Sequence, residues 1–296
     1  MRRNIHVYAA FFFALAALSF QSCAGGPPVL ELPADYHLPQ HPVFLVHGIG
    51  FTSENLTFDY WEGVTPILDE LGVVYFQSTQ PAYGLIEENA AILQGDILGF
   101  LASHPEFDKV NIIAHSRGGL ESRWMITHLG MADRVASLSM LSTPHRGSPI
   151  ANLVYDRVDS REHLVVKSLG VYLALKGEDE TDAYASGLQL TTSFMAAFNR
   201  VVPDVEGVYY QSWAGTIDEQ YHNPVWTGIA DILAVTEGPN DGLVSLKSAR
   251  WGVFRGEIPG TSHAGIINLR RFDGEHRLDV ASFYRDLLGD LAGRGL

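Results

Sequence analysis

The sequence predicts one α/β domain with a mostly parallel central sheet and helices on both faces. The chain has 296 residues, of which 46% are hydrophobic and 18% charged, enough for one large core. Short β-branched runs alternate with longer helical stretches, as in successive βαβ units. The short runs are mainly apolar, which is typical of strands buried on both faces.

The first 22 residues predict an export signal. Arg2 and Arg3 precede an apolar run over 7–20, which is too short to span a bilayer as a stable helix. The only cysteine, Cys23, directly follows this run among small and polar residues, as in lipoprotein signals. We therefore expect either a lipidated Cys23 that anchors the protein in the cell envelope, or cleavage near Ala24 and secretion.

A proline-rich tether over 23–40 leads into a single domain over 41–296. The expected strands are at 43–46, 73–77, 110–114, 135–141 and 208–214, and around 251–258. Helical spacing of apolar residues predicts helices over 87–101, 119–129 and 279–291. The strand rhythm disappears between about 150 and 205, so we interpret this segment as a helical cap insertion, with an unusually apolar stretch over 164–175.

The net charge excludes nucleic acid as a partner. It is −14 at pH 7, and a phosphate-binding surface needs clustered Lys and Arg that this chain does not show. Acidity otherwise indicates only solubility.

The candidate nucleophile is Ser116. The stretch KVNIIAHSRGG predicts a buried strand, a sharp turn at the serine and then a helix, in the order that a nucleophile elbow requires. Ala114 and Gly118 are small, as they must be where a tight turn brings strand and helix backbones together. The start of the helix also directs backbone N–H groups toward a developing oxyanion.

The two expected oxyanion donors are the backbone N–H groups of Ile49 and Arg117. The stretch VFLVHGIG predicts a strand followed by a His-Gly turn, which is the usual source of one donor, and the residue after the nucleophile supplies the other. Since only backbone groups take part, we expect the side chain of His47 to brace the loop by hydrogen bonding.

A serine hydroxyl needs a histidine base and a carboxylate that orients the histidine. Asp241 in a polar turn and His263 after a predicted strand follow Ser116 in the chain order Ser, acid, His. His276 is the rival base, but it looks like an exposed residue before the last helix. His115 and His145 are lesser candidates, the former expected to point elsewhere and the latter to buttress the site.

Several stretches together resemble the bacterial true lipases, the secreted triacylglycerol lipases of proteobacteria. This resemblance implies the α/β-hydrolase fold, and it implies that the aspartate of NDGLV, Asp241, is the triad acid and that His263 is the base. It also implies a mobile helical lid, here between Ala151 and Leu175, although a permanently packed cap helix would fit the sequence equally well. The stretches that carry the resemblance are PVFLVHGIGF, DYWEGVTPILDELG, KVNIIAHSRGGLESR, VASLSMLSTPHRGSP, LTTSFMAAFNRVVP, SWAGT and NDGLVS.

The chain departs from that family in two respects. Members often have a disulfide between cap and core, but Cys23 has no second cysteine to pair with. Members also often bind calcium beside the catalytic histidine, where this chain has Gly265 and Leu269, which offer no side-chain oxygen for Ca²⁺. We therefore expect no metal and no cofactor. The sequence does not determine whether folding needs a dedicated partner.

The resulting hypothesis is a serine carboxylic-ester hydrolase that acts on medium or long acyl esters, with lipid or another ester as its partner and membrane contact through the anchor and lid. A non-lipolytic esterase or a phospholipase would use the same triad. An acyltransferase would share its first step. The alternative from another class is a non-catalytic, envelope-anchored lipid-binding protein, which the intact Ser116, Asp241 and His263 argue against.

Overall fold

The computed structural model describes residues 36–49, 59–152, 180–218, 224–269 and 278–296. The predicted export signal, Cys23, most of the tether, the apolar stretch over 164–175 and His276 all lie outside the described residues. In the described part of the chain, no helix combines the length and the apolar character needed to cross a membrane.

A parallel six-stranded sheet forms the central layer, as the sequence predicts. Its strand order is β2-β1-β3-β4-β5-β6, and every neighbouring pair is parallel. The strands are β1 (Val43–Val46), β2 (Tyr75–Gln77), β3 (Val110–His115), β4 (Val135–Leu141), β5 (Tyr209–Thr216) and β6 (Val253–Pro259).

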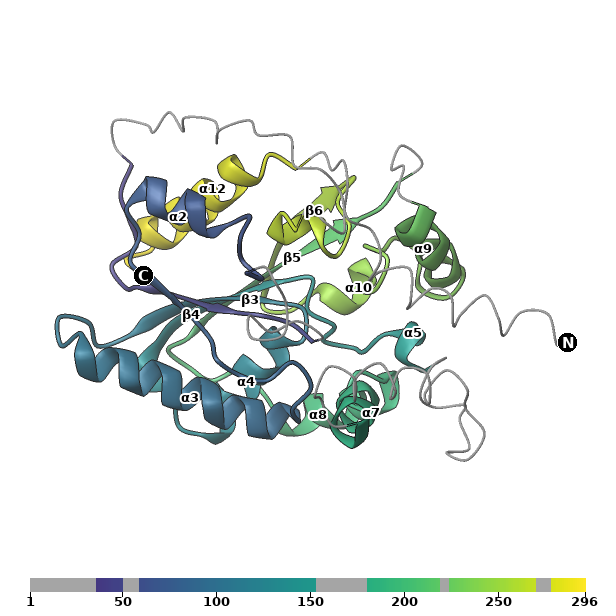
Figure 1. Ribbon diagram of the computed structural model, residues 1–296, viewed down its shortest axis with the longest axis horizontal. Helices are drawn as coiled ribbons and strands as arrows, with labels where there is room; N and C mark the ends of the chain where they lie inside the picture. The colour runs from purple at the N-terminus through teal and green to yellow at the C-terminus, as the bar shows by residue number, and fades with distance from the viewer. Residues whose placement is uncertain (1–35, 50–58, 153–179, 219–223, 270–277) are drawn as a thin grey trace, which may run out of the picture.

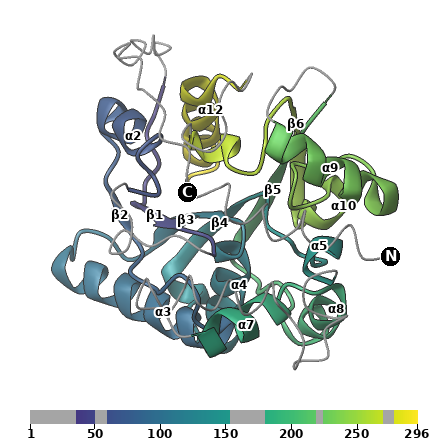
Figure 2. The ribbon, with the colours of Figure 1, turned by 45° about the vertical axis from the view of Figure 1, so that its right-hand side comes forward.

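Helices cover both faces of this sheet (Figures 1 and 2). One face carries α2 (Thr65–Leu71) and α12 (Val280–Gly293), and the other carries α3 (Ile86–Ser103) and α4 (Gly118–His128). The pleat explains the two cores, because alternate residues of a strand point to opposite faces. In β1, Val43 and Leu45 pack toward α2 and α12, whereas Phe44 and Val46 pack toward α3 and α4.

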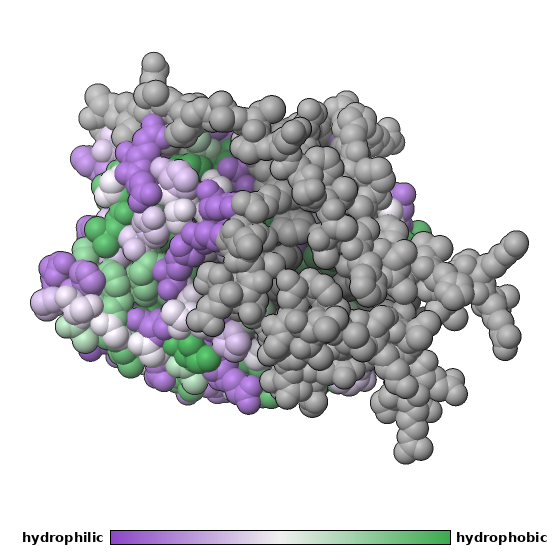
Figure 3. All heavy atoms as spheres, in the orientation of Figure 1, coloured by the Kyte–Doolittle hydropathy of each residue, from purple (hydrophilic) through white to green (hydrophobic). Residues whose placement is uncertain are grey.

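The last helix, α12, shows how sequence spacing positions an element. Asp279 caps it by accepting a hydrogen bond from the Ser282 N–H at 3.1 Å. Its buried residues recur at three- and four-residue intervals, and each large one contributes about 1.5–3 kcal/mol of apolar burial. They are Val280, Ala281, Tyr284, Leu287, Leu288 and Leu291. On the face shown in Figure 3, hydrophilic and hydrophobic side chains mix over α2 and α3, which pack by one side only.

The two edge strands differ from the prediction. The strand expected over 73–77 begins only at Tyr75, and Val74 is exposed. The residues of β6 alternate between exposed and half-buried, because successive side chains point to opposite faces of the sheet and neither face of this edge strand is fully covered. The helix α9 (Pro224–Glu237) and the short helix α10 (Leu246–Ala249) were not predicted.

The predicted cap segment is helical where it is described. It contains α5 (Pro149–Ala151), α7 (Glu180–Leu188) and α8 (Thr192–Val201), and two short 3₁₀ turns, η1 (Ala132–Arg134) and η3 (Gly265–Ile267), lie elsewhere in the domain. In Figure 1, α7 and α8 lie beside α4, close to the carboxyl end of β3. The predicted lid falls mainly on residues outside the described ranges.

Candidate active site

Ser116 stands on the turn between β3 and α4. Its φ of 54° is in the left-handed region, where a residue other than glycine is strained by about 1–2 kcal/mol. The backbone is held there by the Ser116 N–H, which donates to the Leu141 carbonyl of β4 at 2.9 Å. The sharp turn that the sequence predicts is thus present, and the side chain is 6% exposed.

Glycines let the neighbouring backbones approach this turn. A Cβ on Gly118 would lie 2.4 Å from the His47 carbonyl oxygen and 2.8 Å from that of Val46. A Cβ on Gly48 would lie 2.8 Å from Cβ of Ser116. All three distances are shorter than real Cβ contacts, so the turn after β1 can lie against the nucleophile only if these two residues are glycine.

Asp241, in the turn between α9 and α10, and His263, in the loop after β6, meet Ser116. Nε2 of His263 lies 2.9 Å from Oγ of Ser116, and Nδ1 lies 2.8 Å from Oδ2 of Asp241. The second carboxylate oxygen, Oδ1, accepts hydrogen bonds from the backbone N–H groups of Leu243 and Val244 at 3.0 and 2.8 Å. Asp241 is 1% exposed, so its charge faces the imidazole with little competition from water.

The turn after β1 is braced by His47, as expected. Its Nδ1 lies 2.8 Å from the carbonyl oxygen of Gly48 and its Nε2 lies 3.1 Å from that of Gln80. Burial lowers the pKa of His47, which favours the neutral ring. Ile49 follows on this turn and is half-buried. Among the described residues, none accepts a hydrogen bond from the Arg117 N–H.

Tyr60, which was not predicted from the sequence, contacts the backbone of His263 through His115. Its hydroxyl is 2.5 Å from Nδ1 of His115, and Nε2 of His115 is 2.9 Å from the backbone carbonyl of His263. Burial, and then the proximity of His263, lower the pKa of His115 well below its usual value. A neutral His115 that accepts from Tyr60 and donates to the carbonyl supports the main chain of His263. The only sequence signal for Tyr60 is its place in the DYW stretch.

The side chain of His145 is fully buried. Its ring stacks on Trp251, and its Nδ1 lies 3.2 Å from a guanidinium nitrogen of Arg123. Its backbone carbonyl accepts a hydrogen bond from Asn199 of α8 at 2.6 Å. These partners are not triad residues, so the buttressing of the site expected of His145 stays a prediction.

A buried ion pair lies beside the nucleophile. The side chain of Arg117 is fully buried, and its Nε is 3.3 Å from Oε1 of Glu121, one helical turn later. Burial is the largest influence on Glu121 and raises its pKa to about 7, against the opposing effect of Arg117. From the sequence, only the backbone N–H of Arg117 is predicted to take part in the site. The i,i+4 spacing of opposite charges directly after the nucleophile was the signal that could have revealed the pair.

The residues next to His263 do not fit a calcium site. Gly265 begins the 3₁₀ turn η3, and Leu269 is 2% exposed in the hydrophobic core. A hard cation requires oxygen ligands, which neither side chain offers. Within the described ranges there is also no group of three or more His, Cys, Asp or Glu side chains suited to a metal ion.

A serine raised on a strand-to-helix turn beside an imidazole is the arrangement of serine hydrolases with the α/β-hydrolase fold, and the fold and site assign the protein to this class. Solved structures agree on the fold. The mature form of a Bacillus licheniformis lipase superposes with a TM-score of 0.61 and 24% identity, covering 83% of this chain and 93% of that protein. No model of a known protein family matches the chain.

Two relatives show the family. Triacylglycerol lipase 2 of Saccharomyces cerevisiae is 30% identical over 257 residues, which cover 81% of this chain and 75% of the yeast protein. The triacylglycerol lipase of Burkholderia plantarii is 30% identical over 308 residues, which cover 82% and 84%. The chain belongs to the triacylglycerol lipase family and is an ester hydrolase. The resemblance to bacterial lipases is thereby confirmed, and the family extends to yeast.

Proposed function

We propose that the protein hydrolyses triacylglycerols with medium or long acyl chains, using Ser116 as nucleophile, His263 as general base and Asp241 as the orienting acid. The observation that carries this proposal is the continuous contact from the Ser116 hydroxyl through both nitrogens of His263 to the carboxylate of Asp241.

The proposed mechanism follows from that geometry. Nε2 of His263 takes the proton of Ser116 as Oγ attacks the ester carbonyl carbon, and Asp241 stabilises the imidazolium that forms. The backbone N–H groups of Ile49 and Arg117 stabilise the tetrahedral oxyanion. His263 then protonates the leaving alcohol. Water, activated by His263, hydrolyses the acyl-enzyme and releases the carboxylic acid.

The relatives support the substrate class. The yeast and Burkholderia proteins are named triacylglycerol lipases, and each aligns with more than four-fifths of this chain. The strongly apolar stretch over 164–175 of the cap insertion also suits a lipid substrate. A non-lipolytic esterase or a phospholipase would use the same three residues, so activity must separate these candidates.

An acyl-length series on purified protein tests the substrate class, with rates measured below and above the solubility limit of each ester. A rise in rate at the lipid interface with long chains supports a lipase. Saturation on soluble short esters supports an esterase, and a preference for phospholipids supports a phospholipase.

Three variants test the residues. Ser116→Ala and His263→Ala should each lose several orders of magnitude in kcat, whereas His276→Ala should not. Substantial ester hydrolysis by Ser116→Ala would refute the assignment of the nucleophile.

We also propose that the protein is exported and held in the cell envelope through a lipidated Cys23. The basic start, the apolar run over 7–20 and the single cysteine behind it support this proposal. Mass spectrometry of the mature N-terminus tests it, because an acylated cysteine adds the mass of whole fatty chains. A mature chain that begins after Cys23 would show secretion instead.

A further inference from the structure

The side chain of Arg117 makes contacts that the catalytic steps do not use. It is completely buried. Its guanidinium donates hydrogen bonds to the Ser186 hydroxyl of α7, to the Gly84 carbonyl and to Oε1 of Gln189, the last at 3.2 Å. The turn that carries the nucleophile is thus tied to the described end of the cap insertion.

Glu121 extends this network to the other proposed donor. Its Oε1 accepts from Nδ2 of Asn89 at 2.8 Å, and its Oε2 accepts from Nε2 of Gln80 at 3.3 Å. The same nitrogen of Gln80 lies 3.3 Å from the His47 carbonyl, and the Gln80 carbonyl is bound by the ring of His47. His47 lies two residues before Ile49, so the network reaches the turn that carries the first donor.

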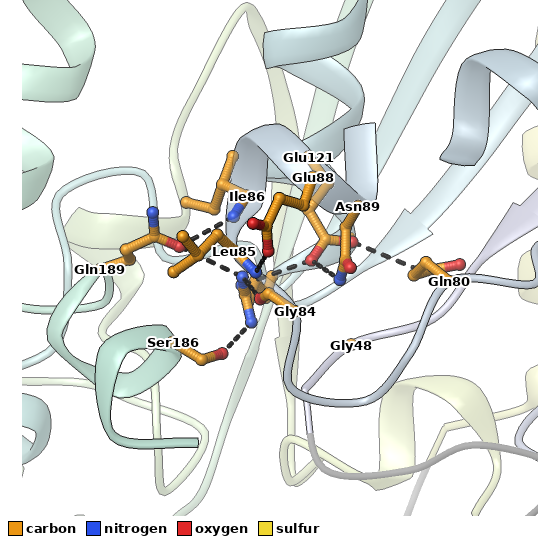
Figure 4. A network of polar contacts seen from close by, with 12 residues as sticks. Gly48, Gln80, Gly84, Leu85, Ile86, Glu88, Asn89, Glu121, Ser186 and Gln189 are labelled. Atoms are coloured by element: carbon orange, nitrogen blue, oxygen red, sulfur yellow. Dashed lines mark hydrogen bonds and ion pairs between the residues drawn. The ribbon is translucent and has the colours of Figure 1, made fainter. Parts of the chain in front are cut away.

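Figure 4 shows the two sides of this cluster. Ser186 and Gln189 come from α7 and the turn after it, while Glu121, Asn89 and Gln80 lie on the opposite side. Oε1 of Gln189 also accepts from the Ile86 N–H at the start of α3, at 2.8 Å. One buried ion pair therefore joins α3, α4, α7 and the turn after β1 around the nucleophile.

We infer that Arg117 and Glu121 are positioning residues that hold the two proposed oxyanion donors in place and couple them to the seating of α7. The inference rests on the proposed function, because it assumes that the Ile49 and Arg117 N–H groups bind the oxyanion. Neither side chain touches the reacting atoms. Each acts through the backbone that it holds.

The energetics of burial support a role other than stability. A buried ion pair often contributes no more to stability than well-packed apolar side chains of the same volume would. The raised pKa of Glu121, caused mainly by burial, shows that its charge is held at an energetic cost. Oxyanion donors, in contrast, act only when they are held within a few tenths of an ångström of the oxyanion, and removing one lowers kcat by about 10²–10³-fold.

The test is a double variant, Arg117→Met with Glu121→Leu, which removes both charges and leaves no unpaired one. We expect it to fold with a melting temperature near that of the wild type. Its kcat should fall at least about tenfold and its KM should change less than about threefold, because the donors act on the transition state. An arylboronic acid, which forms a tetrahedral adduct with the serine, should bind more weakly by a similar factor.

Control variants separate the outcomes. Asp290→Asn removes the carboxylate of another i,i+4 pair, with Arg294 at the C-cap of α12, and should leave kcat unchanged. Ser186→Ala loosens only the contact with α7 and should lower kcat a few-fold, which keeps the inference testable if the double variant does not fold. Wild-type kcat and boronate affinity in a folded double variant, or in Ser186→Ala if the double variant does not fold, would overturn it.

Failure of the proposed function would be seen separately. In the double variant, a fluorophosphonate should still label Ser116 completely, although more slowly. If the wild-type protein is not labelled at Ser116, the proposed function is wrong, whatever the double variant shows.

Discussion

Replacing Asp241 with asparagine isolates the contribution of one negative charge to the site. Oδ1 of Asp241 is held by two backbone N–H donors, so the amide oxygen of the asparagine must take that position. The amide NH₂ then faces Nδ1 of His263, which lies 2.8 Å from the present Oδ2. Nδ1 has to accept a hydrogen bond, which places the ring proton on Nε2, where it blocks transfer from Ser116.

The expected decrease in kcat of Asp241→Asn has two causes, the loss of the negative charge and the loss of the productive tautomer of His263. A charge pair separated by about 4 Å is worth about 4 kcal/mol at an effective dielectric constant of 20, and this stabilisation of the imidazolium disappears. Restoring the productive tautomer costs about another 1–2 kcal/mol. The sum of about 5–6 kcal/mol corresponds to a decrease in kcat of about 10⁴-fold, in line with the same substitution in other triads.

The assay compares kcat/KM on a soluble chromogenic ester, together with melting temperatures, for the wild type, Asp241→Asn and Asp279→Asn. Asparagine keeps the acceptor for Leu243 and Val244, so Asp241→Asn should unfold within a few degrees of the wild type. Asp279→Asn, at the cap of α12, is the matched control and should keep full activity. An Asp241→Asn protein within tenfold of the wild type would refute the reasoning about the tautomer.

Three further predictions concern stability. Gly118→Ala should lower the free energy of unfolding by about 1–3 kcal/mol, because its Cβ meets strand backbone, whereas the exposed Gly99→Ala in α3 should raise it by up to about 1 kcal/mol; urea denaturation that ranks them in the reverse order would contradict this. Tyr60→Phe should lower the free energy of unfolding by about 1–3 kcal/mol, because the buried Nδ1 of His115 loses its hydrogen-bond donor. An unchanged denaturation midpoint would argue against that bond. Glu121 has a folded-state pKa raised to about 7, so it retains a proton that the unfolded chain has lost, and stability falls as the pH rises from about 4.5 to about 7. As the pH rises from 5 to 8, the free energy of unfolding of Glu121→Gln should therefore increase by about 2–3 kcal/mol relative to that of the wild type. A difference between the two proteins that does not change with pH would contradict the raised pKa.

The parts of the fold that were predicted from the sequence are those fixed by local pattern. The strand over 135–141 is found at the predicted residues, because a run buried on both faces stands out against polar flanks. Helix α3 begins one residue before the predicted start. The edge strand β2 is shorter than expected, since hydrophobicity alone does not show where pairing with β1 begins.

In the site, too, local sequence patterns predict some features, whereas others depend on contacts between distant elements. Ser116, Asp241 and His263 were predicted to converge because each follows a predicted strand or lies in a polar turn, and the structure places them in contact. The contacts of Tyr60 with His115, and of Arg117 with Ser186, join residues 55 and 69 positions apart. No local pattern encodes such pairs, because they depend on how separate elements pack together.

Reaction with a fluorophosphonate, followed by peptide mapping, tests the central claim most directly. A single adduct is expected on the peptide that contains Ser116, with no labelling in Ser116→Ala and labelling slowed by several orders of magnitude in His263→Ala. An adduct on another residue, or an undiminished rate in His263→Ala, would contradict the proposal that His263 activates Ser116.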